Sequence, residues 1–97
     1  MLHTVNKSPF QHTTLADCAR FLRSGDVVLL LEDGVLACQV GTLHVALVEG
    51  ILQRVAVYAL GADLKARAIT ELIPGIQVTD YAGFVSLVEQ HKVHAWL

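Results

Sequence analysis

The chain has 97 residues, of which 54% are hydrophobic and 16% are charged, and its formal net charge is −2. This length predicts a single domain over residues 1–97, and the absence of a basic run argues against direct nucleic-acid binding. Because soluble domains usually carry about 25% charged residues, we expect the apolar excess to lie at a subunit interface, although helices on both faces of a sheet are the alternative.

Short apolar runs alternate with helical patterns along the chain, which is typical of βαβ units. The first strand is expected over residues 1–6, and a central strand that is apolar on both faces is expected over residues 26–31. Between them, Thr14 and Asp17 fit a capping box at the start of a helix. One face of that helix carries an apolar stripe formed by Leu15, Cys18, Ala19 and Leu22.

The middle of the chain predicts two helices followed by a strand. Asp33 is expected to cap a short helix that reaches Gln39. The glycine and threonine at residues 41–42 are expected to begin a longer helix. The third strand follows over residues 54–60.

The last third of the chain completes the pattern. Asp63 is expected to cap a helix and to pair with Arg67 one turn later. A short fourth strand is expected over residues 76–78, Asp80 is expected to cap the last helix, and the final strand is expected over residues 93–97. Together these elements predict a three-layer α/β/α fold with a mostly parallel sheet of about five strands.

Open α/β sheets bind ligands at the carboxyl ends of their strands. Here those ends are residues 6–8, 32–34 and 61–63, and no glycine-rich phosphate loop follows any of them, so nucleotide binding lacks its usual cradle. A phosphorylated receiver site would need clustered acids and a lysine. Caps and turns explain Asp33 and Asp63 more simply than catalysis does.

No metal or cofactor site is expected from the five histidines, which are His3, His12, His44, His91 and His94. Only the last two are close in the sequence, and one ends a helix whereas the other belongs to a strand. A shared metal ion is therefore not expected. His3 lies in a strand and is expected to be a core imidazole with satisfied hydrogen bonds.

Two cysteines, Cys18 and Cys38, are candidate reactive groups. They form no C-x-x-C motif, so we expect free thiols without a disulfide. Cys18 is either a small buried hydrophobe, with its pKa raised above the usual value of about 8.5, or a persulfide carrier that needs exposure. Cys38 lies more than a turn inside its helix, where the dipole helps a thiolate little, so we expect it to be structural.

No targeting or membrane segment is expected. The chain begins with a strand pattern instead of a cationic region and a cleavable apolar stretch, so we expect no signal peptide. The apolar run at residues 27–31 is far shorter than the roughly 18 residues that span a bilayer. We therefore expect a cytoplasmic protein without a membrane partner.

Several segments, in their order and spacing, resemble the DsrH/TusB family, the smallest subunit of the bacterial sulfur-relay complexes DsrEFH and TusBCD. These segments are residues 2–4, 8–10, 29–35, 58–60, 63–67, 80–81, 84–85 and 95–96. The strings at residues 6–10, 64–67, 73–76 and 96–97 look more like DsrH than TusB. Cys18 matches a cysteine position typical of DsrH, and Ala68 stands where many relatives carry glycine.

The resemblance implies a cytoplasmic dimer of heterotrimers with DsrE-like and DsrF-like subunits. In complexes of this family the principal sulfur-carrying cysteine lies on the DsrE-type (TusD-type) subunit, and the acceptor is a small DsrC/TusE-type protein. We expect a DsrH-like, mainly architectural subunit in sulfur oxidation, not catalytic by itself. The alternatives are a TusB-type subunit in 2-thiouridine synthesis on tRNA, or a subunit that itself carries persulfide on Cys18. A homo-oligomeric domain that binds a small molecule is a third alternative, which the missing phosphate loop disfavours.

Overall fold

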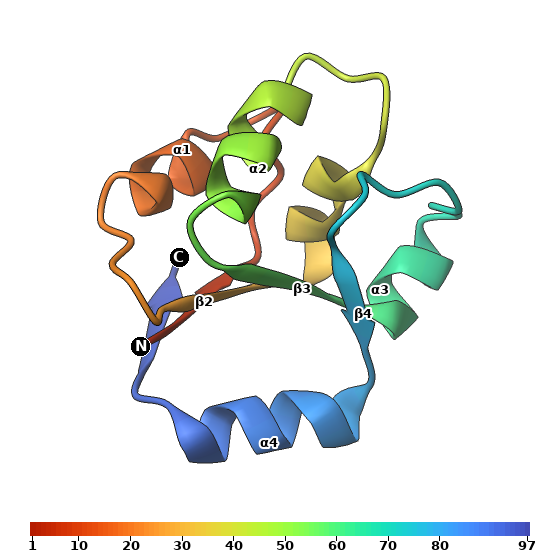
Figure 1. The fold of residues 1–97 in the computed structure, drawn as a ribbon. Coiled ribbons are helices and arrows are strands. Elements are labelled where there is room, and N and C mark those ends of the chain that lie inside the picture. Colours follow the sequence, from red (N-terminus) through yellow and green to blue (C-terminus); the bar gives the residue numbers. More distant parts are fainter.

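A single five-stranded sheet organises the protein, and every pair of neighbouring strands in it is parallel. The computed structural model describes all of residues 1–97 and gives the strand order β4-β3-β2-β1-β5 (Figure 1). The strands are β1 (Leu2–Val5), β2 (Val27–Leu30), β3 (Ala56–Leu60), β4 (Gln77–Thr79) and β5 (Val93–Trp96). Each expected strand is present, and the parallel sheet is confirmed.

Strand β2 occupies the centre of the sheet, as expected from its uninterrupted apolar sequence. Val27 pairs with Leu2 of β1 on one side and with Ala56 of β3 on the other. All four residues of β2 are buried, because helices cover both faces of a central parallel strand. The edge strands differ, since most residues of β4 and β5 are exposed.

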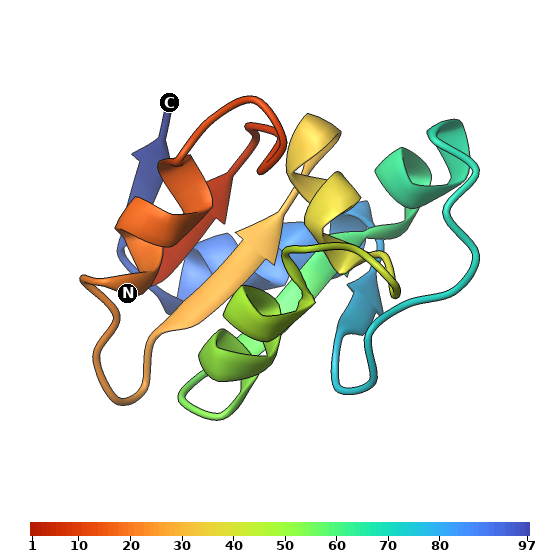
Figure 2. The same ribbon diagram turned by 90° about the horizontal axis from the view of Figure 1, so that it is seen from above.

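The helices form two layers of unequal size around this sheet (Figure 1). One face carries α1 (Thr14–Ala19), the 3₁₀ helix η1 (Glu32–Cys38), α2 (Val45–Leu52) and α3 (Gly61–Ala66). The other face carries only α4 (Tyr81–Gln90). Figure 2 shows α1 and α2 in front of the sheet and α4 behind it. The expected three-layer α/β/α fold is therefore confirmed.

The two faces of the sheet bury cores of very different size. Sixteen buried residues form the cluster beneath α1, η1, α2 and α3, whereas four form the cluster beneath α4. At the usual strand spacing, five strands are about 20 Å wide, which is about twice the diameter of one helix. One helix therefore cannot cover this face of the sheet completely.

Side-chain capping is confirmed at the last helix and differs from expectation at the first. The Asp80 carboxylate accepts the N–H of Gly83 at 2.8 Å and so caps α4. The predicted capping box of Thr14 and Asp17 is wrong, because α1 begins at Thr14 and its N-cap residue is Thr13. The Thr13 hydroxyl donates to the Asp17 carboxylate at 3.0 Å, and neither side chain caps the helix backbone.

The three other expected caps, at Asp33, Thr42 and Asp63, are also wrong. The Thr42 hydroxyl accepts the N–H of His44 at 3.1 Å, and α2 begins only at Val45. The Asp33 carboxylate binds the guanidinium of Arg67, a charged donor that bonds more strongly than a helix N–H group does. The Asp63 carboxylate accepts the N–H of Glu32, the first residue of η1, so it binds the start of a different helix from its own.

None of the helices is both long enough and apolar enough to cross a membrane. The longest of them, α4, has 10 residues.

Ala68 ends α3 in a left-handed conformation that usually belongs to glycine. Its φ angle is +54°. The N–H groups of Ala68 and Ile69 donate to the carbonyls of Lys65 and Leu64 at 3.1 and 3.0 Å, which is the Schellman arrangement at a helix end. The alanine Cβ makes this conformation costly, which is why glycine is the common residue at such a helix end.

The substitution Ala68→Gly should raise the free energy of unfolding by about 1 kcal/mol, because relief of the left-handed strain outweighs the extra freedom of glycine in the unfolded chain. Denaturant titration of the purified protein measures the change. Ala66→Gly is the matched control in the right-handed last turn of α3 and should lower stability by about 0.5–1 kcal/mol. An Ala68→Gly protein that is no more stable than the parent would contradict this account.

Candidate functional site

Three charged residues meet where β2 and β3 end. Arg67 donates to the Asp33 carboxylate from Nε at 3.0 Å and from Nη2 at 2.9 Å. Its Nη1 lies 3.6 Å from the Asp63 carboxylate, so the expected pair of Asp63 and Arg67 is confirmed. Asp63 also accepts the backbone N–H of Glu32 at 2.7 Å. Both acids therefore hold neighbouring segments together instead of facing an open site.

The lysine at the same edge of the sheet does not join these acids. Lys7 forms no ion pair or hydrogen bond with Asp33 or Asp63. Asn6, which precedes it, has a buried Oδ1 atom without a hydrogen-bond partner. A phosphorylated receiver site needs a lysine beside clustered acids, and this edge does not provide that arrangement.

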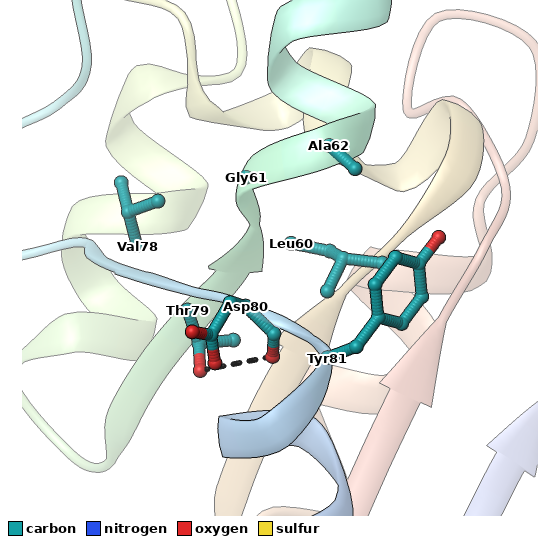
Figure 3. Close-up of a pocket in the computed structure, with 7 residues that line it drawn as sticks. All are labelled: Leu60, Gly61, Ala62, Val78, Thr79, Asp80 and Tyr81. Atoms are coloured by element: carbon teal, nitrogen blue, oxygen red, sulfur yellow. Dashed lines mark hydrogen bonds between the residues drawn. The ribbon is translucent and has the colours of Figure 1, made fainter.

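A shallow hollow of about 430 Å³ lies between the ends of β3 and β4 (Figure 3). Its lining residues are Leu60, Gly61, Ala62, Val78, Thr79, Asp80 and Tyr81. The one acid among them, Asp80, already caps α4. A second hollow of about 230 Å³ lies beside Gln39 and Glu71. Neither hollow is lined by a cysteine, histidine or lysine, so neither gives access to the two thiols of the chain.

Cys18 lies on the buried side of α1, as its place in the apolar stripe predicted. Its side chain is fully buried and belongs to the same cluster as Leu15 and Leu22. Burial, with a smaller contribution from the negative charge of nearby Asp26, raises the pKa of the Cys18 thiol to about 12. At neutral pH this side chain is therefore an uncharged thiol that solvent does not reach.

His3 and Asp26 are bonded to each other, and they do not activate Cys18. The Nε2 atom of His3 lies 2.9 Å from the Asp26 carboxylate, and Trp96 Nε1 donates to His3 Nδ1 at 3.1 Å. Since Nδ1 accepts from Trp96, the proton of the neutral ring is on Nε2, which donates to Asp26. Neither ring nitrogen is free to accept a proton from Cys18, so the three residues do not form a catalytic triad.

Asp26 is the best-connected acid of the protein. Besides His3, it accepts the N–H of Arg23 at 3.0 Å and the N-terminal ammonium of Met1 at 3.0 Å. Desolvation favours the neutral acid, but these hydrogen bonds and the ammonium charge outweigh it and hold the pKa of Asp26 well below its ordinary value. Asp26 is therefore a carboxylate throughout the physiological pH range.

This group of hydrogen bonds was only partly foreseen. The sequence predicted a buried, satisfied His3, which is confirmed, since the residue is 3% exposed. The partners Asp26 and Trp96 were missed, although they are adjacent once β2 and β5 pair with β1. The pairing of β1 with β5 also sets His3 beside His94. Sequence order alone does not reveal which strands are neighbours.

Cys38 is buried like Cys18. It ends η1, so the short helix that the sequence predicted here is present as a 3₁₀ helix. Its side chain is fully buried, and burial raises the pKa of the thiol to about 12. The carbonyl of Cys38 accepts the N–H of Ile73 at 2.9 Å, which ties this segment to the loop before β4.

Histidines and acids do not gather into a metal site. No group of three or more His, Cys, Asp or Glu residues lies close enough to hold a metal ion. His94 instead packs against Trp96 with ring centroids 4.8 Å apart, and His44 packs edge-on against Phe10 at 4.7 Å. The chain therefore contains two buried thiols and several structural ion pairs. It has no exposed nucleophile that a neighbouring side chain activates.

Comparison with known proteins decides the family. The family model described as "DsrH like protein" matches residues 7–94. The chain belongs to the DsrH-like family. Its resemblance to the DsrH/TusB family is therefore confirmed. Membership supports a role in sulfur relay together with other subunits of the same system.

Curated relatives of this DsrH-like protein carry the name "Protein TusB". The protein of Photorhabdus laumondii is 37% identical over 98 residues, and the alignment covers 99% of this chain and 100% of the relative. The protein of Escherichia coli K12 is 40% identical over 98 residues with the same coverage. The protein of Serratia proteamaculans is 40% identical over 93 residues, with 95% of each chain covered.

Solved structures share the fold at low sequence identity. The ychN protein from E. coli superposes with a TM-score of 0.82 at 19% identity, covering 97% of each chain. The protein MTH1491 of Methanobacterium thermoautotrophicum superposes with a TM-score of 0.70 at 16% identity, covering 97% of this chain and 95% of that chain. At such identities the likeness concerns the fold alone.

The substitution Asp26→Asn should lower the free energy of unfolding at neutral pH by about 2 kcal/mol, because an amide accepts more weakly from the three donors. Because folding lowers the pKa of Asp26, its carboxylate stabilises the fold at pH values above the unfolded pKa of about 3.8. That contribution is lost as the pH falls through the lower folded value. Denaturant titrations at neutral and acidic pH should therefore show a smaller acid-induced loss in Asp26→Asn, and an equal loss in both proteins would contradict this role.

Proposed function

We propose that the chain is a TusB-type subunit of a cytoplasmic sulfur-relay complex. Its role in that complex is architectural, and the relayed sulfur travels on a cysteine of another subunit. The observation that carries this proposal is the complete burial of both thiols, Cys18 and Cys38, in a chain of the DsrH-like family. The partners are TusD-type and TusC-type subunits, which correspond to the DsrE-like and DsrF-like subunits, in a dimer of heterotrimers.

The chemistry of persulfide transfer explains why burial matters. A carrier thiolate attacks the outer sulfur of a donor persulfide and releases the donor as a thiolate. The carrier must therefore be deprotonated and within reach of a second protein. Cys18 has a pKa of about 12 and no exposed surface, so it meets neither requirement. This argues against the alternative in which Cys18 carries the sulfur.

The names of the relatives favour tRNA thiolation over sulfur oxidation. The sequence strings predicted a DsrH-like role first, but the matched relatives from P. laumondii and E. coli are TusB proteins at 37% and 40% identity over 98 residues each. We therefore place the TusB-type role first, with a TusE-type acceptor and 2-thiouridine in tRNA as the end product. The DsrH-type role in sulfur oxidation, with a DsrC-type acceptor, is the second candidate, which the DsrH-like strings at residues 64–67 and 73–76 favour.

The outer side of α4 supports an association with other subunits. Phe84 and Leu87 pack toward the sheet. Three more apolar residues follow one another at helical spacing along α4 and are exposed: Tyr81 by 62%, Val85 by 55% and Val88 by 40%. Tyr81 also lines the hollow at the ends of β3 and β4 (Figure 3). An exposed apolar stripe on a helix that already buries its other side is typical of a surface that a partner covers.

Deletion of the gene should lower 2-thiouridine in tRNA, and a copy carrying Cys18→Ser should restore it to near the parental level, because the buried thiol is not a carrier. Nucleoside mass spectrometry of bulk tRNA measures the modification. A deletion that leaves 2-thiouridine unchanged but impairs sulfur oxidation would favour the DsrH-type role.

The same question has a direct biochemical control. The purified complex is incubated with a persulfide donor, and the mass of each subunit is measured. This chain should gain no sulfur, whereas the TusD-type subunit should. A reductant-sensitive gain of one sulfur atom on this chain, absent from Cys18→Ser, would establish Cys18 as the carrier.

Val85→Lys should weaken binding of the partner subunits by about tenfold or more, because it puts a charge into the proposed apolar contact. Ser86→Lys is the matched control, since it adds the same charge to the adjacent exposed residue on a different side of α4. Co-purification of tagged chain with its co-expressed partners measures the effect. Equal partner recovery for the two variants would show that α4 is not the contact.

A further inference from the structure

Strand β5 is an edge strand without the usual protection against pairing. It lies beside β1 at the rim of the sheet (Figure 2). Val93, His94 and Ala95 are exposed, and residues 93–97 contain no charged side chain and no proline. Natural edge strands usually carry charges, prolines or bulges, because free backbone N–H and C=O groups attract another strand. The opposite edge, β4, is only three residues long and is followed directly by Asp80.

The free hydrogen-bonding groups of β5 can be assigned from its pairing with β1. The N–H of Leu2 donates to the carbonyl of Lys92 at 2.7 Å, so the backbone groups of Lys92 face β1. Backbone groups alternate between the two sides of a strand, so those of His94 and Trp96 face β1 as well. The groups that face outward are those of Val93 and Ala95. Their complement is a second extended strand, because only such a strand repeats donors and acceptors at the matching interval.

The side chains of β5 are sorted between the two faces of the sheet. His94 and Trp96 share one face, where their ring centroids are 4.8 Å apart. Phe21, which is 64% exposed, extends this aromatic group with its ring 5.7 Å from that of Trp96. Val93 and Ala95 share the other face. The strand therefore presents one aromatic and one aliphatic side, both without charge.

We propose that β5 pairs in antiparallel fashion with β5 of a second copy of this chain, about a twofold axis that passes between the two Ala95 residues. Opposed residues of an antiparallel pair point to the same face of the joined sheet. The axis at Ala95 sets His94 opposite Trp96 of the partner subunit. It also sets Val93 opposite Leu97 of the partner subunit, and the two Ala95 residues exchange hydrogen bonds.

A second copy fits this edge because a twofold contact must be complementary to itself. The strand has no charge that would repel its own copy, and a partner with a charged strand would find no opposite charge here. The register at Ala95 pairs aromatic with aromatic and aliphatic with aliphatic side chains in both directions at once. Such cross-strand pairs stabilise sheets. This contact uses a different surface from the outer side of α4 and does not depend on the proposed sulfur-relay function.

Charge exchange at Ala95 tests the contact and its register. The full chain should sediment as a dimer. Ala95→Lys and Ala95→Glu should each sediment as monomers with unchanged circular dichroism, because two like charges meet at the axis while the exposed side chain leaves the monomer intact. A mixture of the two variants should recover the dimer, since Lys and Glu then face each other. Gln77→Lys adds the same charge to the opposite edge strand and should remain dimeric.

A second variant tests the backbone contact. Ala95→Pro removes an outward N–H group that β1 does not use, so it should also give a folded monomer. A parent chain that sediments as a monomer would overturn the proposal, as would any dimer or larger assembly that persists in Ala95→Lys, Ala95→Glu and Ala95→Pro. A mixture of the Lys and Glu variants that stays monomeric would overturn the register at Ala95.

Discussion

The carboxylate of Asp26 ties the turn before β2 to the N-terminal strand of the chain. It accepts hydrogen bonds from the N-terminal ammonium, from the N–H of Arg23 and from His3 of β1. His3 in turn accepts from Trp96, so the hydrogen bonds continue from the start of β2 across β1 to β5. The same bonds leave His3 unable to serve as a base, and the Asp26 charge discourages ionisation of Cys18. The Asp26 carboxylate therefore stabilises this corner of the fold and also adds to the burial that keeps its thiol inert.

The strands could be predicted from the sequence because each is a short apolar run, and β2 in particular is apolar on both faces. The burial of Cys18 followed from its helical phase with Leu15 and Leu22. Most capping residues could not be predicted, because Asp33 and Asp63 find an arginine and a backbone N–H group outside their own helix starts. Such partners depend on which segments become neighbours, and local sequence does not contain that information.

The unequal layers of the fold account for the composition of the chain. A central strand buried on both faces requires apolar cover above and below, and the lower cover consists of α4 alone. Part of the apolar excess that this arrangement cannot bury remains exposed on α4 and along β5. Other exposed apolar residues, such as Leu43, lie on the opposite side of the sheet in the loop before α2. The carboxyl edge around Arg67 is polar in contrast.

Trp96 is the only tryptophan in the chain, and its position gives the protein a built-in optical probe. The indole hydrogen-bonds to His3, packs against His94 and Phe21, and remains partly exposed at the rim of the sheet. Intrinsic tryptophan fluorescence of this protein therefore reports the surroundings of β5 rather than an average over the molecule. Detachment of the edge strand and its coverage by another molecule would change the emission in opposite directions, because one exposes the indole to water and the other removes water from it.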